Sequence, residues 1–582
     1  MSRLTTLLSQ PQRRRRLGLA LCAAPVAIQA LAVALLGVNT ILWDEFFYVP
    51  FIREVFEGRN WWHWMTLQHN EHRVVPMKLL MVPLALLTNW DTRAEMWASV
   101  ALAALTVFGL WRLYRHLGGD DLLLFAPVAW LVCSLGHYEN MLYGMMVSWY
   151  FVVVGVVWML VLLSAPGALL VAGAVLCAFT AAFTNLNGLL VFPLGLGMLL
   201  VYRRWRAAAV WLAVSIGAFV LYFVRFQMPG GQPPLPHLGL AAIARIARFG
   251  IKLLGAPLAG GSVAWSIVIG VLLIAATAAV ALRWRRPSRL RRDVPAAGLI
   301  AFGALSGAMI AAGRAAYQGI PPLQSRYMLD TVLVIVGLYL LLARAVEQSE
   351  PASPPRRLLV PVLALLVPGL LAANAEGLRA ALEWRNWQLQ QKAILQTFDQ
   401  RPASELGGIY FLEQVPPAAS WLRQHRVGPF ADAPEVVLLV HWQDGVPAEE
   451  ILPGRPVEQT LVCPVGRIED VAVVFATYAR QNTSHVVLSL SEKGRQLGRR
   501  ELAAADLKDN GWVSLPVDVR DCRGRTLVLR VESPDARPGN AVTVWTYPHY
   551  YGGEVSQGGN PRIAGRSLGL AINGFTAQLL HD

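Results

Sequence analysis

Charged residues are scarce in this chain, and their scarcity excludes an ordinary soluble protein. Only 15% of its 582 residues are charged, well below the roughly 25% of a typical soluble domain. Instead 55% are hydrophobic, and apolar runs long enough to cross a bilayer recur up to about residue 374. A soluble enzyme, a disordered chain and a fibrous chain are therefore excluded. The composition predicts a polytopic α-helical membrane protein with one water-soluble domain at its C-terminal end.

Acidic residues are outnumbered by basic ones, which leaves a formal net charge of +14. A nucleic-acid-binding protein would gather this charge on one face of a soluble domain. Here the arginines cluster in short loops between apolar runs, which is typical of the cytoplasmic loops of membrane proteins. We therefore expect membrane lipids as partners and no nucleic acid.

Cysteine is rarer still, with five in the whole chain. Cys22, Cys133 and Cys177 lie in apolar runs, where a thiol is an inert packing group. Cys463 and Cys522 both lie in the soluble C-terminal domain. If that domain is extracytoplasmic, these two could form a disulfide, although spacing alone does not pair them.

The N-terminus resembles a secretory signal, because Arg13–Arg16 precede an apolar stretch. That stretch, Leu17–Leu42, is longer than the roughly 7–15 residues of a signal-peptide core. We interpret it as an uncleaved first membrane span that begins in the cytoplasm. Ten further spans are expected near residues 95–111, 121–136, 145–164, 167–183, 188–201, 207–224, 263–282, 295–312, 327–343 and 358–374.

The apolar run 76–89 decides the orientation of all later spans. It is short for a membrane span and contains Pro76, Lys78 and Pro83, so we place it at the outer interface. With that choice nearly every dense arginine cluster lies in the cytoplasm, as the positive-inside rule requires. An odd number of spans then puts the C-terminal domain outside. The Ala- and Arg-rich composition indicates a bacterial chain, which places the protein in the inner membrane with this domain in the periplasm.

This topology gathers unusual polar residues at the outer face of the membrane. Ionisable groups at membrane depth cost at least about 2.5–3.5 kcal/mol by insertion scales, so they indicate function by default. The first outer loop begins with Asp44 and Glu45, which are the candidate catalytic residues. The candidate substrate-binding residues are His69, Glu71, His72, Arg73, His137, Glu139, Asn140, Asn187, Arg225, Arg314, Arg326 and Tyr327.

Each of these residues also has a purely structural interpretation. Asparagines could cap helices, Arg314 and Arg326 could extend to lipid head groups, and His69–Arg73 could be a turn held by its own hydrogen bonds. A metal site is less favoured, because His69 and His72 form a His-x-x-His spacing with no obvious third ligand. We therefore expect neither a metal nor a cofactor.

A carboxylate and arginines at a membrane surface suit the transfer of a group from a lipid phosphate. The carboxylate can act as a general base toward an acceptor hydroxyl, and arginines can hold the phosphate with bidentate hydrogen bonds. One well-placed charge stabiliser is worth roughly 3–4 kcal/mol on the oxyanion-hole scale. A metal is not required when arginines supply the positive charge.

Four motifs, in this order, resemble the GT-C superfamily of membrane glycosyltransferases. They are Trp43-Asp44-Glu45 directly after the first span, Gln68–Arg73, Tyr138-Glu139-Asn140 and Ser325-Arg326-Tyr327. The superfamily includes protein mannosyltransferases and the aminoarabinose transferase that acts on lipid A. The resemblance covers the membrane part of the chain and extends to the C-terminal domain.

This resemblance implies a polyprenyl-phosphate-linked sugar as donor, usually with inversion at the anomeric carbon. Our first hypothesis is that such a transferase modifies a cell-envelope glycan or lipid. It implies that the acidic residue after the first span is catalytic, which maps onto Asp44 with Glu45 beside it. Contacts to the donor phosphate map onto Arg314 and Arg326. The segment His69–Arg73 has no counterpart in the better-known members.

The soluble part is expected to begin with a connector and to end in a β-sandwich. Residues 1–374 form the membrane domain, 375–455 a helix and mixed connector, and 456–582 a domain of short alternating strands separated by turns. That rhythm predicts a jelly-roll-like sandwich, and the domain looks similar to carbohydrate-binding modules. Aromatic residues at strand ends usually pack in a core, but four of them could stack on sugars: Trp545, Tyr547, Tyr550 and Tyr551.

Three alternatives to such a transferase stay open. An O-antigen ligase or polymerase would use a diphosphate-linked donor, but the position of Asp44-Glu45 directly after the first span favours the GT-C type. A lipid or polysaccharide transporter would line a path across the membrane with polar groups, whereas here they lie at one face and mid-span charges are scarce. The outer motifs could also serve only to stabilise loops.

Overall fold

The structure is a computed structural model, and it divides into two compact units. The first comprises residues 1–38 and 50–386, and the second comprises residues 39–49 and 387–582. The boundary predicted at residue 374 therefore lies inside the first unit. The described residues are 10–228, 239–316, 323–350, 352–398, 401, 403–431, 435–439, 445–463, 466–522, 524–548, 555–558, 563 and 566–575.

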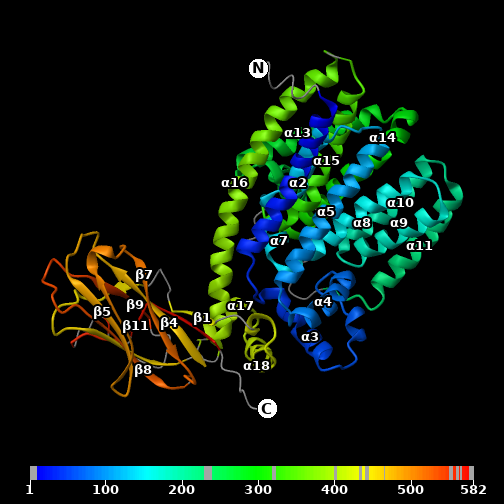
Figure 1. The fold of residues 1–582 in the computed structure, drawn as a ribbon. Coiled ribbons are helices and arrows are strands. Elements are labelled where there is room, and N and C mark those ends of the chain that lie inside the picture. Colours follow the sequence, from blue (N-terminus) through cyan, green and yellow to red (C-terminus); the bar gives the residue numbers. More distant parts are fainter. Residues whose placement is uncertain are drawn as a thin grey trace. The chain divides into compact units, whose positions relative to one another are not determined.

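The first unit is built of helices, as its apolar composition predicts (Figure 1). Within the described part of the chain, nine helical segments are long and apolar enough to cross a membrane, and Ala168–Ala182 and Leu186–Val201 are shorter apolar helices. Together these match the positions of the predicted spans. The helices are α2 (Pro11–Leu36), α3 (Val49–Phe56), α4 (Val75–Thr88), α5 (Arg93–His116), α6 (Leu122–Val132), α7 (Tyr138–Leu142), α8 (Val147–Ser164), α9 (Ala168–Ala182), α10 (Val191–Val201), α11 (Trp205–Phe223), α12 (Leu240–Gly255), α13 (Val263–Arg283), α14 (Pro287–Arg314), α15 (Ser325–Glu347) and α16 (Pro354–Gln396).

Several helix ends differ from the prediction for local reasons. The first helix ends at Leu36 and not at residue 42, because Gly37 adopts an extended conformation. Within the span predicted to end at 136, the regular α-helix α6 stops at Val132, where the Ser134 hydroxyl accepts a hydrogen bond from the backbone N–H of Gly136 at 3.1 Å, although the apolar helical segment continues to Leu142. The predicted span 358–374 and the helix expected after it are one continuous helix, α16, of 43 residues.

The run predicted to lie at the interface forms α4, a helix of 14 residues. At 1.5 Å per residue it is about 21 Å long, less than the roughly 30 Å of a hydrocarbon core. Left-handed residues bound it on both sides, Val74 with φ 47° and Asn89 with φ 52°. The chain therefore turns sharply into and out of this helix.

The centre of the helical unit is α15, whose apolar window is 83% buried, packed with α8, which is 78% buried. The peripheral helices α13 and α16 are only 17% buried over their windows, as expected of helices that face lipid. Close packing of α14 on α15 requires glycine at 337, because an added Cβ there would lie 3.0 Å from the carbonyl oxygen of Ala296.

The second unit begins with the segment 39–49, which contains the short 3-10 helix η1 (Trp43–Tyr48). The side-chain amide of Asn39 donates a hydrogen bond to the carbonyl of Gly428 at 2.8 Å, which ties this segment to a chain region almost 400 residues later. Two helices lie in that later region, α17 (Ala403–Ile409) and α18 (Val415–His425).

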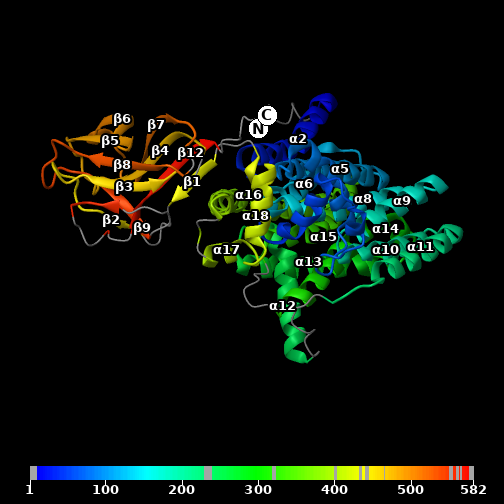
Figure 2. The ribbon, with the colours of Figure 1, turned by 90° about the horizontal axis from the view of Figure 1, so that it is seen from below.

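Strands complete the second unit and form two antiparallel sheets around a common apolar core (Figure 2). One sheet has the order β1-β12-β4-β9-β11, with β2 beside β9 and β7 beside β4, and the other has the order β10-β3-β8-β5-β6. The strands are β1 (Glu435–Leu439), β2 (Val446–Pro447), β3 (Val457–Val462), β4 (Arg467–Ala476), β5 (His485–Glu492), β6 (Arg495–Ala503), β7 (Gly511–Val519), β8 (Thr526–Glu532), β9 (Thr543–Pro548), β10 (Val555–Ser556), β11 (Arg566–Leu568) and β12 (Leu570–Phe575).

The β-rich C-terminal region is confirmed, but the sequence indicated only the strands that correspond to β3, β4, β5, β7, β8 and β9. The strands β1 and β2 lie in the predicted connector, and β6, β10, β11 and β12 were not expected either. Of these, β6 is an edge strand whose residues are half-buried or exposed. An edge strand without a buried face lacks the apolar alternation by which strands are recognised.

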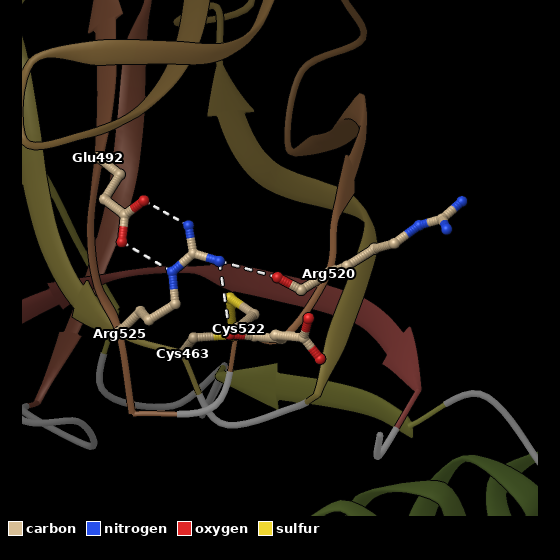
Figure 3. Close-up of a disulfide and its surroundings, with 6 residues drawn as sticks. Cys463, Glu492, Arg520, Cys522 and Arg525 are labelled. Atoms are coloured by element: carbon tan, nitrogen blue, oxygen red, sulfur yellow. Dashed lines mark hydrogen bonds and ion pairs between the residues drawn. A yellow bond between two sulfur atoms is a disulfide. The ribbon is translucent and has the colours of Figure 1, made fainter. Parts of the chain in front are cut away.

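A disulfide joins Cys463 and Cys522 inside this unit, with their Cα atoms 5.7 Å apart (Figure 3). The guanidinium of Arg525 lies beside it, donates to the Glu492 carboxylate at 2.7 Å through Nε, and also donates to the carbonyl of Arg520 at 2.8 Å. The spacing of the two cysteines in the sequence did not decide whether they pair, and the structure shows that they do.

Removal of this bridge should destabilise the sandwich. We expect the double variant Cys463→Ser/Cys522→Ser to lower its free energy of unfolding by about 2–4 kcal/mol, because the bridge closes a loop with a sequence separation of 59. Limited proteolysis of the full chain along a temperature series measures the effect. The half-buried thiol of Cys177 provides the control, and equal melting of the Cys177→Ser and double variants would contradict the prediction.

Candidate functional site

The two candidate catalytic carboxylates lie in η1 of the second unit. The turn begins at Trp43, which has a left-handed φ of 44°. The ring of Trp43 lies 4.9 Å from that of Trp387, and the ring of Phe46 stacks on Tyr410 at 5.6 Å between centroids. Aromatic contacts on both sides of the carboxylates therefore hold this turn in place.

Asp44 and Glu45 have different surroundings, although they are adjacent in sequence. Glu45 is 1% exposed, and its carboxylate accepts a hydrogen bond from the backbone N–H of Leu42 at 3.2 Å, so it caps the turn. Asp44 is only half-buried. It lies near Tyr410, since burial first and then the charge of Asp44 raise the pKa of that phenol. Asp44 is thus the more accessible of the two carboxylates.

The histidine pair in the loop between α3 and α4 forms a tight turn in the first unit. The backbone groups of His69 and His72 exchange hydrogen bonds of 2.7 and 2.9 Å around Asn70, which has φ 50°. The Nδ1 of His72 accepts from the backbone N–H of Leu186 at 3.0 Å, so the ring proton of neutral His72 is on Nε2. Within the described residues, no group of three or more His, Cys, Asp or Glu side chains is arranged to hold a metal ion.

Arg73 is almost fully buried and binds backbone carbonyls. Its guanidinium donates to the carbonyls of Thr66 at 2.7 Å, Tyr222 at 2.9 Å and Val224 at 2.7 Å. Burial lowers the pKa of this guanidinium from its ordinary value. Arg73 therefore fastens the loop between α3 and α4 to the end of α11, in accord with the structural interpretation of this segment.

Lys78 is fully buried and was not among the residues selected from the sequence. Its ammonium donates to the carbonyls of Trp64 at 2.7 Å, Leu67 at 2.6 Å and Arg73 at 3.1 Å. Three acceptors match the three protons of an ammonium group. Lys78 thus organises the loop from inside. The sequence signal that could have identified this residue was a single lysine within the apolar run that forms α4.

Glu71, in the loop between α3 and α4, forms an ion pair of 2.8 Å with Arg314, the last residue of α14. Both side chains are about one-fifth to one-quarter exposed, at 19% and 24%, so solvent and ligands can reach them. The Nε2 of His72 lies 3.8 Å from the same carboxylate. We refer to Glu71, His72 and Arg314 as the loop cluster. Arg225 is exposed in the turn after α11.

The start of α15 carries a second set, the cap cluster of Glu139, Ser325 and Arg326. The Glu139 carboxylate accepts from the Ser325 hydroxyl at 2.5 Å and from the backbone N–H of Arg326 at 3.1 Å. This places a carboxylate at the positive end of the helix dipole. The Arg326 guanidinium lies 5.4 Å from the centre of the Tyr327 ring, and its Nε has no hydrogen-bond partner among the described residues.

Three further candidates next to the cap cluster are buried. The Nδ1 of His137 lies 3.3 Å from the carbonyl of Val132, and His137 is 1% exposed. The Asn140 amide donates to the carbonyl of Arg326 at 3.2 Å. Tyr327 is 5% exposed and packs in an apolar cluster. Asn140 therefore binds a backbone group of the cap cluster, whereas His137 and Tyr327 are packed in the interior.

A buried triad joins Asn187 to two residues that the sequence did not reveal, Ser306 and Asp330. The Asp330 carboxylate accepts from the Ser306 hydroxyl at 2.7 Å and from the Asn187 amide, which also donates to the Ser306 oxygen at 2.8 Å. Asp330 and Ser306 are 0% exposed. The isolated aspartate in an apolar span was the available signal for this group.

The three clusters meet around one end of α14 and α15. His72 of the loop cluster binds the N–H of Leu186, and Asn187, the next residue, belongs to the buried triad. Asp330 of the triad follows Arg326 of the cap cluster by one turn of α15. Within the first unit, most of the selected residues therefore belong to one connected polar region, whereas Asp44 and Glu45 belong to the second unit.

Comparison of the chain with family models, with curated proteins and with solved structures gives no match.

Proposed function

We propose that this protein is a membrane glycosyltransferase that transfers a sugar from a polyprenyl-phosphate-linked donor to a cell-envelope glycan or lipid. The observation that carries the proposal is the connected polar region at one end of α14 and α15. It contains the exposed edge of the Glu71–Arg314 ion pair and the cation of Arg326. Cations at a membrane surface suit a lipid phosphate, and the resemblance to GT-C glycosyltransferases supplies the reaction.

In this proposal Asp44 is the general base. Its carboxylate takes the proton from the acceptor hydroxyl, whose oxygen then attacks the anomeric carbon of the donor sugar. The bond between that carbon and the phosphate oxygen breaks, so the polyprenyl phosphate leaves with the electron pair. Attack from the face opposite the phosphate inverts the anomeric centre. The solvent access of Asp44 favours it over Glu45, whose carboxylate caps η1.

The leaving phosphate needs positive charge, and two arginines are candidates. Arg326 has an Nε without a partner among the described residues, so it can bind a phosphate without losing an ion pair. Arg314 is already paired with Glu71 and would have to exchange one anion for another. We therefore assign the main phosphate contact to Arg326 and a supporting one to Arg314.

The positions of the charges support a transferase over a transporter. Along α15, Asp330 lies in the second turn and Arg344 in the last one. A polar path across the membrane would need ionisable groups between these two ends. A ligase or polymerase with a diphosphate-linked donor would use the same cations and stays the second choice.

We further propose that the C-terminal sandwich is jelly-roll-like, lies in the periplasm and holds the glycan acceptor. The disulfide supports an extracytoplasmic location, because such bonds persist in oxidising compartments. The indole N–H of Trp545 donates to Asn510 at 2.8 Å and leaves this ring half-buried, whereas Tyr547 is 1% exposed and belongs to the interior. Tyr550 and Tyr551 lie outside the described residues.

Deletion of the gene in its host tests the proposed function. We expect one sugar-sized mass to disappear from an envelope glycan or glycolipid and to return when the wild-type gene is restored, as measured by mass spectrometry. Empty vector is the control. If no glycan or glycolipid changes in mass, the proposed function is wrong.

A further inference from the structure

A cavity of about 550 Å³ lies between α13, α14, α15 and α16, outside the polar region described above. Its volume is in the range of small-molecule and cofactor sites, roughly 300–1,000 Å³. One part of its lining is basic and the rest is aliphatic. Such a division fits an amphiphile with an anionic head and a hydrocarbon chain.

The basic part of the lining holds four arginines and one aspartate. Asp293 is satisfied by Arg344 at 2.7 Å, by the indole N–H of Trp284 at 3.2 Å and by Arg292 at 3.3 Å. One carboxylate cannot neutralise four guanidinium groups, so this part has an excess of three positive charges. The remaining lining arginines are Arg283 and Arg289.

Arg344 is a buried donor with spare capacity. It is 5% exposed, it lines the cavity, and its Nε has no hydrogen-bond partner among the described residues. A buried guanidinium group that is not fully satisfied is costly. An anion in the cavity would supply the missing acceptor.

The aliphatic part of the lining lies on the peripheral helices. Leu272 of α13 and Leu358 of α16 line the cavity and are 49% and 55% exposed. Both helices are among the least covered of the unit, with 17% of their apolar windows buried. A hydrocarbon chain from the bilayer could therefore enter between them without passing through water.

This cavity and the proposed catalytic region serve opposite leaflets. Arg344 follows Arg326 by eighteen residues on the same helix, α15, which is about 27 Å at 1.5 Å per residue and close to the thickness of a hydrocarbon core. The arginine-rich end is the cytoplasmic one by the positive-inside rule. The proposed polyprenyl-phosphate donor reacts at the Arg326 end of α15, so its phosphate would not lie in this cavity at the Arg344 end.

We propose that the cavity binds an anionic phospholipid of the cytoplasmic leaflet, with its phosphate on Arg289, Arg292 and Arg344 and an acyl chain between α13 and α16. Basic pockets between membrane helices on the cytoplasmic side bind anionic head groups for the same reason. The bound lipid acts as a fixed part of the bundle that completes the hydrogen bonds of Arg344. This site is independent of the glycosyl transfer proposed above.

Native mass spectrometry of the purified full-length chain tests the site. We expect phosphatidylglycerol to stay bound at least tenfold more than phosphatidylcholine, and the double variant Arg289→Gln/Arg292→Gln to lose that preference. The matched control is Arg245→Gln/Arg248→Gln, which removes the same charge from the exposed face of α12. The control should bind as the wild type does.

A second variant tests the acyl-chain part of the site separately from its charged part. Val362→Trp should fill the aliphatic part and reduce phosphatidylglycerol binding with every arginine in place, because Val362 lines the cavity. Equal binding of the two lipids, equal binding by the arginine variant and its control, or unchanged binding by Val362→Trp would overturn the proposal. So would full occupancy by inorganic phosphate, or by polyprenyl phosphate in preference to phosphatidylglycerol.

Discussion

Asp44→Asn should reduce sugar transfer by roughly 10²–10⁴-fold, because the amide cannot take the proton of the acceptor hydroxyl. The change keeps the size and shape of the side chain, so η1 should keep its fold. The measurement is mass spectrometry of the envelope glycans in a deletion strain that carries the variant, with equal membrane levels of the protein checked in parallel. Asp44→Glu should retain part of the activity, since a carboxylate is still present.

Glu45→Gln is the matched control for Asp44→Asn. The same isosteric change one residue later weakens the hydrogen bond to the N–H of Leu42, which lowers stability by about 1 kcal/mol. It should leave most of the transfer activity in place. If Asp44→Asn restores the glycan fully while Glu45→Gln does not, the two roles are reversed. If both restore it fully, neither carboxylate is the base.

Lys78→Met should be the most destabilising single change in α4 and the loop before it. It removes the donor to the carbonyls of Trp64, Leu67 and Arg73. The Trp64 carbonyl still accepts a hydrogen bond from the backbone N–H of Leu67 at 3.3 Å, so two carbonyls lose this partner without replacement. Each unsatisfied group costs about 1–3 kcal/mol, so we expect a loss of about 2 kcal/mol or more in the free energy of unfolding. Thermal unfolding of the purified protein in detergent measures this loss.

Lys252→Met is the control for Lys78→Met. It makes the same chemical change on the amphipathic helix α12, where Lys252 is half-buried. It should change stability by less than about 0.5 kcal/mol, as surface substitutions usually do. Equal melting temperatures for Lys78→Met and Lys252→Met would show that the buried ammonium does not organise the loop.

The two predictions distinguish a loss of chemistry from a loss of stability. Asp44→Asn should reduce activity at constant stability, whereas Lys78→Met should reduce activity only as far as the protein unfolds. The sequence presented Arg73 and the histidine pair as candidates for substrate binding. Their observed bonds to backbone groups favour the structural interpretation that was open for this segment.

The sequence by itself determined the division of the chain into a helical, apolar part and a β-rich part. Apolar runs and arginine-rich loops are local patterns, and each helix or strand buries its own face in a way that is visible in a short window. The exceptions were local too. The polar edge strand β6 had no apolar face to detect, and the end of the first helix depended on the extended conformation of Gly37.

Only the tertiary structure decided which polar residues share a site and what each one does. Asn187, Ser306 and Asp330 come from three separate segments, and their hydrogen bonds exist because helix packing brings them together. Asp44 and Glu45 are adjacent acidic residues that the sequence does not distinguish. In the structure Glu45 caps a turn, whereas Asp44 keeps solvent access. The physical reason is that burial and hydrogen-bond partners depend on contacts between distant segments, whereas periodicity and composition depend on neighbours along the chain.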